Sequence, residues 1–431
     1  MCARRSAPIS TAFVPERAVL VGVDTGNASW PHEQSMAELA RLVETDGAEV
    51  VAELSQRLDR AVPRTFIGSG KVEELVRTVE ALEANVVVFD DELSPSQQAN
   101  LERAVGHDVK VIDRTALILD IFGRHATTRE GRLQVQLAQL QYVYPRLRGM
   151  WSHLMKEKRR GGIGSRFGQG ENQLEADRRI VRDRITTLRR ELARLDTQRS
   201  TQRKARWDSG VFRVALAGYT NAGKSTLLNQ LTGSAVYAKD ELFATLDPTT
   251  RALVLPEGRK ITLTDTVGFI QKLPTTLVEA FKSTLAEVAN ADLVLLVADV
   301  SDPHVHAELD AVREILGQVG AADIDQLVVL NKRDLLDADE VPAVARAHPG
   351  AVLVSAAEGT GVDGLLYAIA DCAASQGVTM TVRVPYDKGM LVNMLHEGCQ
   401  IIRESYEGDA ILATARIPRR MEKTFLPYAV E

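Results

Sequence analysis

The sequence predicts an α/β protein in four parts, and three observations lead to this prediction. Apolar runs of strand length alternate with segments of helical periodicity from residue 18 to residue 112. Strand signals stop between residues 124 and 206, and the alternation resumes at residue 211. Such alternation is typical of parallel sheets covered by helices, and 431 residues are too many for one hydrophobic core. The expected parts are an N-terminal α/β subdomain (1–123), a basic helical subdomain (124–208), a central domain with a doubly wound sheet (209–376) and a small C-terminal α+β domain (377–431).

In the N-terminal part, short apolar runs predict strands, and each run is followed by a helical pattern. Ser94 and Pro95 mark a helix start, because Ser caps free N–H groups and Pro fits the first helical position. Gly68-Ser69-Gly70-Lys71 lacks the spacing and the hydroxyl of a phosphate loop, so we interpret it as a turn whose glycines allow tight packing. Whether this region binds ATP or unwinds RNA stays open. Strands are expected at 18–24, 49–53, 86–89 and 109–112, and helices at 36–44, 72–83 and from 95.

The middle part concentrates positive charge. Residues 124–206 hold 21 Lys or Arg against 8 Asp or Glu, a net +13 within a chain of net −6, which leaves −19 on the rest. A basic surface of this kind fits a phosphate-rich polymer such as RNA, although a solvated helix face gives the same count. Helices are expected at 132–142 and from Leu174, where apolar residues keep helical spacing as far as Leu195 and indicate a helical hairpin or a short coiled coil.

The central part predicts strands at 211–217, 260–264, 293–297, 327–330 and 352–354. The first strand runs into Gly218 to Ser225, a complete G-x-x-x-x-G-K-S in a strand, loop and helix context. Backbone N–H groups of such a loop surround phosphates, Lys224 neutralises the β- and γ-phosphates, and the Ser225 hydroxyl can bind Mg²⁺. β-rich runs within 379–417, around a helix near 388–396, predict the C-terminal α+β domain.

Three further motifs follow in order, each at the end of a predicted strand. Asp265 to Gly268 places a carboxylate near the metal and a Gly N–H near the γ-phosphate. Asn331 to Asp334 ends in a carboxylate that can accept from N1 and the 2-amino group of guanine, and Ser355 to Ala357 can meet the guanine carbonyl oxygen. Strand ends of this kind share one crevice, so the four motifs together predict GTP as the ligand.

Between the first two motifs lies a candidate first switch, residues 243–251. A hydroxyl here is expected to reach Mg²⁺ only with the triphosphate bound, and we favour Thr245 over Thr249 or Thr250. Phe269 stands after Gly268, where many GTPases place the Gln that orients water, so slow intrinsic hydrolysis is expected. The expected catalytic residues are Lys224, Thr245 and Gly268, and the metal ligands Ser225 and Thr245. The expected nucleotide-binding residues are Gly218, Tyr219, Thr220, Asn221, Ala222, Gly223, Lys224, Ser225, Phe243, Ala244, Thr245, Leu246, Asp247, Asp265, Thr266, Val267, Gly268, Asn331, Lys332, Arg333, Asp334, Ser355, Ala356 and Ala357.

Two stretches outside these motifs narrow the choice. Residues 123–140 read GRHATTREGRLQVQLAQL and residues 160–171 read RGGIGSRFGQGE. Together with FATLDPTTR and DTVGF, they resemble the HflX family of ribosome-associated P-loop GTPases, over residues 19–418. The resemblance implies binding of GTP and Mg²⁺, hydrolysis of GTP, contact with the large ribosomal subunit and its RNA, and the splitting or rescue of stalled or idle ribosomes under stress.

The sequence leaves alternatives open for the role of the basic loop and for the role of GTP. The loop with Arg159, Arg160 and Arg166 is either a linker or a segment that orders on RNA. GTP could stabilise a passive RNA-binding module, but Thr245 and residues 265–268 favour an enzyme that senses the third phosphate. Cysteines without paired spacing and apolar runs shorter than a bilayer span indicate a cytoplasmic protein, with partial membrane association left open. A monomer is also expected.

Overall fold

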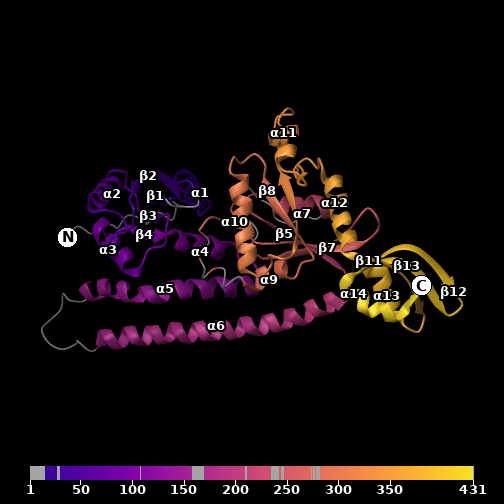
Figure 1. Cartoon of the computed structure of the whole chain (residues 1–431). Helices are drawn as coiled ribbons and strands as arrows, with labels where there is room; N and C mark the ends of the chain where they lie inside the picture. The colour runs from indigo at the N-terminus through magenta and orange to yellow at the C-terminus, as the bar shows by residue number, and fades with distance from the viewer. Residues whose placement is uncertain are drawn as a thin grey trace, which may run out of the picture. The chain divides into compact units, whose positions relative to one another are not determined.

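A computed structural model describes residues 15–26, 30–106, 108–157, 169–208, 211–233, 242–243, 247–272, 274, 277 and 282–430 (Figure 1). Two compact units make up the chain, one of residues 1–121 and 143–176, the other of residues 122–142 and 177–431. No described helix is both long and apolar enough to cross a bilayer.

The first unit contains a four-stranded parallel sheet in the order β2-β1-β3-β4. Val19, Val21, Val87 and Phe89 of β1 and β3 are almost fully buried in its core. Ser94 caps α3 in a reciprocal capping box with Gln97, as the Ser-Pro pair predicts. The elements are β1 (Arg17–Asp24), α1 (His32–Thr45), β2 (Glu49–Arg57), α2 (Ser69–Ala81), β3 (Val86–Phe89), α3 (Pro95–Val105), β4 (Lys110–Asp113) and the first part of α4 (Arg114–His125).

The interpretation of Gly68 to Lys71 needs a correction. Tight packing holds at Gly68, the N-cap of α2, where a Cβ would lie 3.1 Å from Nε2 of Gln56, but not at Gly70, where a Cβ would meet no atom within 4 Å. Lys71 forms an ion pair with Glu74 one turn along the helix, at 2.9 Å. The segment is therefore the first turn of a surface helix. The helix α4 follows β4 directly and was not among the predicted elements.

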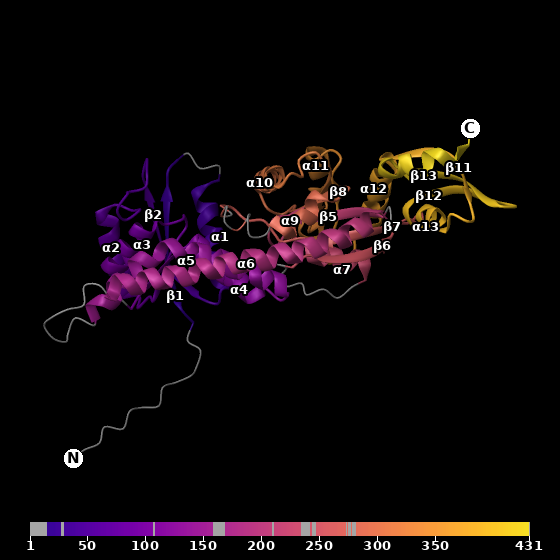
Figure 2. The same cartoon turned by 90° about the horizontal axis from the view of Figure 1, so that it is seen from below.

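Two long helices follow, α5 (Arg129–Glu157) and α6 (Gln169–Asp208), and both are visible in Figure 2. Within the second unit, Arg129 pairs with Glu191 at 3.8 Å, and Arg184 donates to Gln136 at 3.0 Å. From Arg129 to Gln136 the chain advances seven residues along α5, and the partners Glu191 and Arg184 lie seven residues apart in the reverse order along α6. These parts of the helices are therefore antiparallel, as expected for a helical hairpin. Leu188 is buried as expected, but Ile180 is 64% exposed and does not continue the apolar stripe.

The second unit is built on a six-stranded sheet in the order β10-β9-β8-β5-β7-β6, in which only β6 is antiparallel to its neighbour. Its strands are β5 (Phe212–Gly218), β6 (Thr249–Val254), β7 (Lys260–Asp265), β8 (Leu293–Asp299), β9 (Asp325–Asn331) and β10 (Val352–Leu353). β6 occupies part of the predicted first switch and was missed, because its alternation is partly polar and exposed. The sheet is otherwise the doubly wound arrangement that the sequence predicts.

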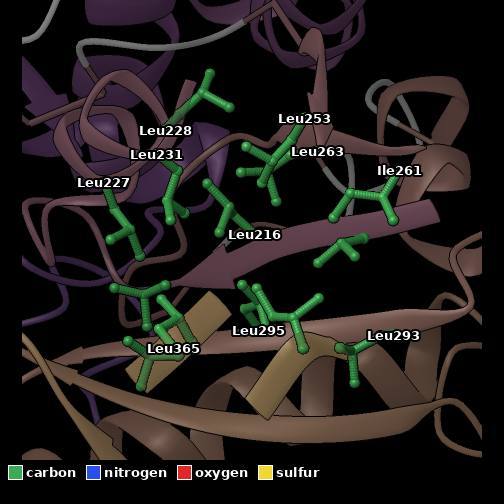
Figure 3. Close-up of a cluster of buried hydrophobic side chains, with 14 of the residues drawn as sticks. Leu216, Leu227, Leu228, Leu231, Leu253, Ile261, Leu263, Leu293, Leu295 and Leu365 are labelled. Carbon is green, nitrogen blue, oxygen red and sulfur yellow. The ribbon is translucent and has the colours of Figure 1, made fainter. Parts of the chain in front are cut away.

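Helices cover both faces of this sheet. On one face, Leu216 and Leu295 of the sheet belong to the same core cluster as Leu227 of α7 (Lys224–Thr232) and Leu365 of α12 (Val362–Ser375). Figure 3 shows these side chains. The helices α9 (Lys282–Ala289) and α10 (Val305–Gln318) contact β5 and β8 without joining that cluster, so they lie on the opposite face. The short η2 (Arg333–Leu335) and α11 (Val341–Ala347) lie between β9 and β10 in the chain. This packing fixes the strand ends that carry the candidate site.

The C-terminal part is a second, antiparallel sheet in the order β12-β13-β11-β14. Its core is formed by Val382, Val384, Ala413, Ala415 and Phe425. The α+β prediction is correct, although α14 and β14 were not foreseen. The elements are β11 (Gly377–Pro385), α13 (Gly389–Gly398), β12 (Gln400–Glu407), β13 (Ala410–Pro418), α14 (Arg419–Phe425), η3 (Leu426–Tyr428) and β14 (Ala429–Val430).

Candidate functional site

The phosphate loop connects the end of β5 to the start of α7. Gly218 closes the strand, and Lys224 and Ser225 open the helix. Gly223 has φ of +87°, and a Cβ there would lie 2.2 Å from Nδ2 of Asn331. Only glycine meets both demands, so the second glycine of the motif lets the loop turn against the end of β9. The free N–H groups of the first turn of α7 point toward the region where an anion would bind.

Lys224 is buried, with 6% of its surface exposed. Its Nζ donates to the carbonyl oxygens of Gly218 at 3.1 Å and Tyr219 at 2.7 Å. Burial lowers the pKa of Lys224 to about 8, and the negative charges of Asp265 and Glu308 limit the fall. The ammonium group therefore lies inside the loop as a desolvated cation, which is the group that phosphate oxygens need.

Oxygen ligands for a divalent cation meet beside the lysine. The Ser225 hydroxyl donates to Oδ2 of Asp265 at 2.6 Å, and Asp265, the last residue of β7, is fully buried. A hydroxyl and a carboxylate are hard donors of the kind that Mg²⁺ accepts, with the remaining positions left for phosphate and water. The chemistry of these two residues fits a magnesium ion, and the role of Ser225 as a ligand stays a prediction.

The segment after Asp265 is fastened to the phosphate loop. Thr266 donates through Oγ1 to the carbonyl of Leu216 at 2.6 Å. Phe269 donates through its N–H to the Gly218 carbonyl at 3.1 Å and accepts from the Thr220 N–H at 2.8 Å. A Cβ at Gly268 would lie 3.1 Å from Nζ of Lys224, so Gly268 and Lys224 adjoin the same space.

Phe269 itself is 1% exposed and forms a parallel bridge with Tyr219. Its backbone groups are paired and its ring is in the core. The residue therefore fixes the second motif against the first and has no polar group with which to orient a water molecule. Val267 is 6% exposed and lies in the same connection.

Asn331 joins two of the predicted motifs, and it is 2% exposed at the end of β9. Its Nδ2 donates to the carbonyl of Ala222 at 2.8 Å, and its Oδ1 accepts from the N–H of Ala356 at 2.9 Å. One side chain thus connects the phosphate loop with the last motif. The Arg333 N–H donates to the Val354 carbonyl at 3.1 Å.

Asp334 is exposed, and its Oδ1 accepts from the Ser355 hydroxyl at 2.5 Å, so its role toward a base stays a prediction. Ala357 follows Ala356 and is exposed. Lys332 has φ of +62° and forms an ion pair with Asp299 at 2.6 Å.

Within the first switch, the structure describes Phe243 and residues 247–251. Phe243 and Asp247 are placed, whereas Ala244, Thr245 and Leu246 lie outside the described residues. Asp247 accepts hydrogen bonds from Thr127 and Thr128, and the ring of Phe243 contacts that of Phe122. The metal-binding role of Thr245 therefore stays a prediction.

Three consecutive stretches match known family descriptions. Residues 33–123 match "GTP-binding GTPase N-terminal", residues 125–206 match "GTP-binding GTPase Middle Region", and residues 213–332 match "50S ribosome-binding GTPase". The chain is 44% identical to "GTPase HflX" of Lacrimispora saccharolytica, over 95% of each chain. It belongs to the HflX family of GTPases. "GTPase HflX" of Escherichia coli is 42% identical, over 89% of this chain and 90% of the relative.

A solved structure also resembles this HflX-family chain. It is that of a GTP-binding protein from Sulfolobus solfataricus in complex with GDP, 25% identical, covering 84% of this chain and 99% of the other, with a TM-score of 0.42.

Sequence reasoning missed two sets of residues around this HflX-family site. Asp299 ends β8, and its place at a strand end beside the nucleotide motifs was a usable signal. Thr127 and Thr128 precede a helix in the middle region, 119 or more residues before Asp247, and no local pattern connects them to it. Only the folded chain brings these residues together.

Proposed function

We propose that this GTPase acts on ribosomes, chiefly on the large subunit, and splits or rescues stalled or idle ribosomes under stress. The match of residues 213–332 to "50S ribosome-binding GTPase" is the observation that carries the proposal. The net charge of +13 on residues 124–206 supports it independently, because ribosomal RNA is a dense array of phosphates. The chain acts in the cytoplasm, as a monomer.

Within the nucleotide site, each of the four motifs contacts a different part of GTP or its Mg²⁺ ion. Lys224 and the loop N–H groups hold the β- and γ-phosphates, and Asp334 reads guanine. Ser225 and Thr245 bind Mg²⁺, which neutralises charge on the phosphate oxygens when it is bound. The Gly268 N–H senses the γ-phosphate. Hydrolysis yields GDP and phosphate, and the loss of the γ-phosphate releases the contacts of Thr245 and Gly268.

Hydrolysis by the free protein is slow, because Phe269, which is buried in the core, offers no side-chain amide at its own position to orient water. The ribosome completes the site by ordering the switch segments. This arrangement delays hydrolysis until the protein has reached its target. A passive RNA-binding module would not need this dependence on the third phosphate.

Sedimentation in sucrose gradients tests the proposal. Intact ribosomes and isolated large subunits are incubated with the protein and GDP, GTP or a non-hydrolysable GTP analogue. We expect the analogue to hold the protein on the large subunit, GTP to convert intact ribosomes into subunits, and GDP to do neither. Equal binding with GDP and with the analogue would instead support the passive module, and no binding to either particle would refute ribosome action.

Salt dependence tests the RNA contact. Replacing Arg159, Arg160 and Arg166 by Gln is expected to flatten the plot of log affinity against log salt, by roughly 0.7–0.9 for each lost phosphate contact. The matched control replaces three arginines outside the basic segment, Arg313, Arg346 and Arg403, by Gln and changes the net charge equally. Equal slopes in the two triple variants would show that the loop is a linker.

A further inference from the structure

The carboxylate of Asp247 is held by the residues that precede helix α5. Its Oδ2 accepts from the Thr127 N–H at 3.1 Å, the Thr127 hydroxyl at 2.8 Å and the Thr128 N–H at 2.8 Å. Its Oδ1 accepts from the Thr128 hydroxyl at 2.5 Å. Two adjacent residues of the middle region therefore donate four hydrogen bonds to one carboxylate of the first switch. Bonds to an ionised acceptor are stronger than those between neutral groups.

A second contact lies at the other described end of the same switch. The rings of Phe243 and Phe122 meet edge to face, with centroids 4.5 Å apart and planes at 82°. Both side chains are buried, with exposures of 2% and 1%. Residues 243 and 247 thus both attach to one short stretch, residues 122–128, and Thr245 lies between them in the sequence.

The stretch that holds Asp247 is itself well fixed. The Thr128 hydroxyl accepts from the Gly131 N–H at 3.0 Å, so Thr128 caps α5 while it binds Asp247. The carboxylate lies at the positive end of the helix, which favours an anion. α5 is in turn paired with α6 through Arg129 and Gln136.

Gly131 adds a steric condition. A Cβ at Gly131 would lie 2.5 Å from Oδ1 of Asp247, closer than any contact between a Cβ and an oxygen allows. The approach of Asp247 to the helix therefore requires a glycine at this position, which provides an independent way to disturb the contact.

We infer that Thr127 and Thr128 are positioning residues of the GTPase reaction. They hold Asp247 so that the first switch is presented to the triphosphate and its metal ion. The inference rests on the proposed role of the first switch. GDP is held by the phosphate loop and the base-reading motifs, which the contact does not touch. Loss of the contact therefore raises the ordering cost of triphosphate binding alone.

The sharpest test is Gly131→Ala. Alanine favours the helix, so the fold of α5 is retained while the new Cβ displaces Asp247. We expect the Kd for a non-hydrolysable GTP analogue with Mg²⁺ to rise at least about tenfold, the loss of one charge-assisted hydrogen bond, and kcat to fall. The Kd for GDP stays within about twofold, since no GDP contact changes. The control is Gly317→Ala in α10, where a Cβ would meet no atom within 4 Å.

A second variant pair removes the two hydroxyl donors and keeps the two backbone N–H donors. Thr127→Val with Thr128→Val is expected to show the same selective loss, and the Ser versions restore binding because they keep the hydroxyls. The triple variant with Asp247→Ala is expected to bind the analogue no more weakly than Asp247→Ala alone, because the two hydroxyls act on the switch through this carboxylate. Thr186→Val with Thr187→Val is the matched control, since these hydroxyls donate only to carbonyls of their own helix.

The outcomes separate this inference from the nucleotide site itself. Wild-type affinities in Gly131→Ala and in the Val pair would overturn the inference, and so would an equal loss of GDP and analogue binding, which would indicate a merely structural role. Lys224→Ala is the reference for the site. If Lys224→Ala also leaves both affinities unchanged, the assignment of the nucleotide site fails and not only the positioning role.

Discussion

Asn331→Ala tests whether one side chain holds the phosphate and base loops together. The substitution leaves the Ala222 carbonyl and the Ala356 N–H without partners, at positions where both residues are 3% exposed or less. Each unsatisfied buried group costs about 1–3 kcal/mol, so the intact geometry loses about 2–6 kcal/mol. At the lower limit, nucleotide affinity falls roughly 30-fold, since about 1.4 kcal/mol corresponds to a factor of ten.

The assay is titration with fluorescent GDP and a fluorescent GTP analogue. Because Asn331 connects loops that hold both nucleotides, the two Kd values are expected to rise by the same factor. Asn100→Ala is the control, as the Asn100 side chain donates to one carbonyl, that of Arg64, in the first unit. Retained affinity, or a loss confined to the triphosphate, would refute the connecting role.

Three further predictions concern the base, the lysine and the second motif. Asp334→Asn is expected to shift preference from GTP toward xanthosine triphosphate, because the amide donates where the carboxylate accepts, and unchanged GTP affinity would refute this. GTP affinity is expected to fall above about pH 8 by up to about tenfold per pH unit, because Lys224 with its lowered pKa loses its charge there; a constant Kd from pH 7 to 9.5 would contradict it. Phe269→Leu is expected to leave the slow intrinsic rate within a few-fold, and large subunits are expected to raise the wild-type rate at least about tenfold. A fast wild-type rate of hydrolysis without ribosomes would refute the expected dependence on large subunits.

The sequence predicts the central sheet and its motifs because those features are local. A strand, a glycine loop and a helix lie next to one another in the chain, so Gly218 to Ser225 is recognisable without the fold. β6 escaped prediction because it is an edge strand, whose residues Arg251 and Ala252 are exposed and give no apolar alternation. Its strand character comes from pairing with β7.

Contacts between distant segments could not be predicted in this way. The pairing of Thr128 with Asp247 depends on how the start of α5 packs against the switch, which no spacing encodes. Asn331 was predicted to bind the nucleotide, but its two bonds to neighbouring loops follow from the order of strands in the sheet. Ile180 satisfies the helical spacing and is nevertheless exposed. Periodicity identifies a candidate face, and only the tertiary partner decides how far along the helix that face is covered.

The β-bridge between Phe269 and Tyr219 limits how this chain could be re-engineered. A glutamine at position 269 would be buried in the core, where its amide would lack hydrogen-bond partners and would have no water to orient. The unsatisfied amide would lower the free energy of unfolding by about 1–3 kcal/mol. One substitution therefore cannot turn the chain into a self-sufficient hydrolase. Under the proposed function, the ribosome therefore sets the lifetime of the GTP-bound form.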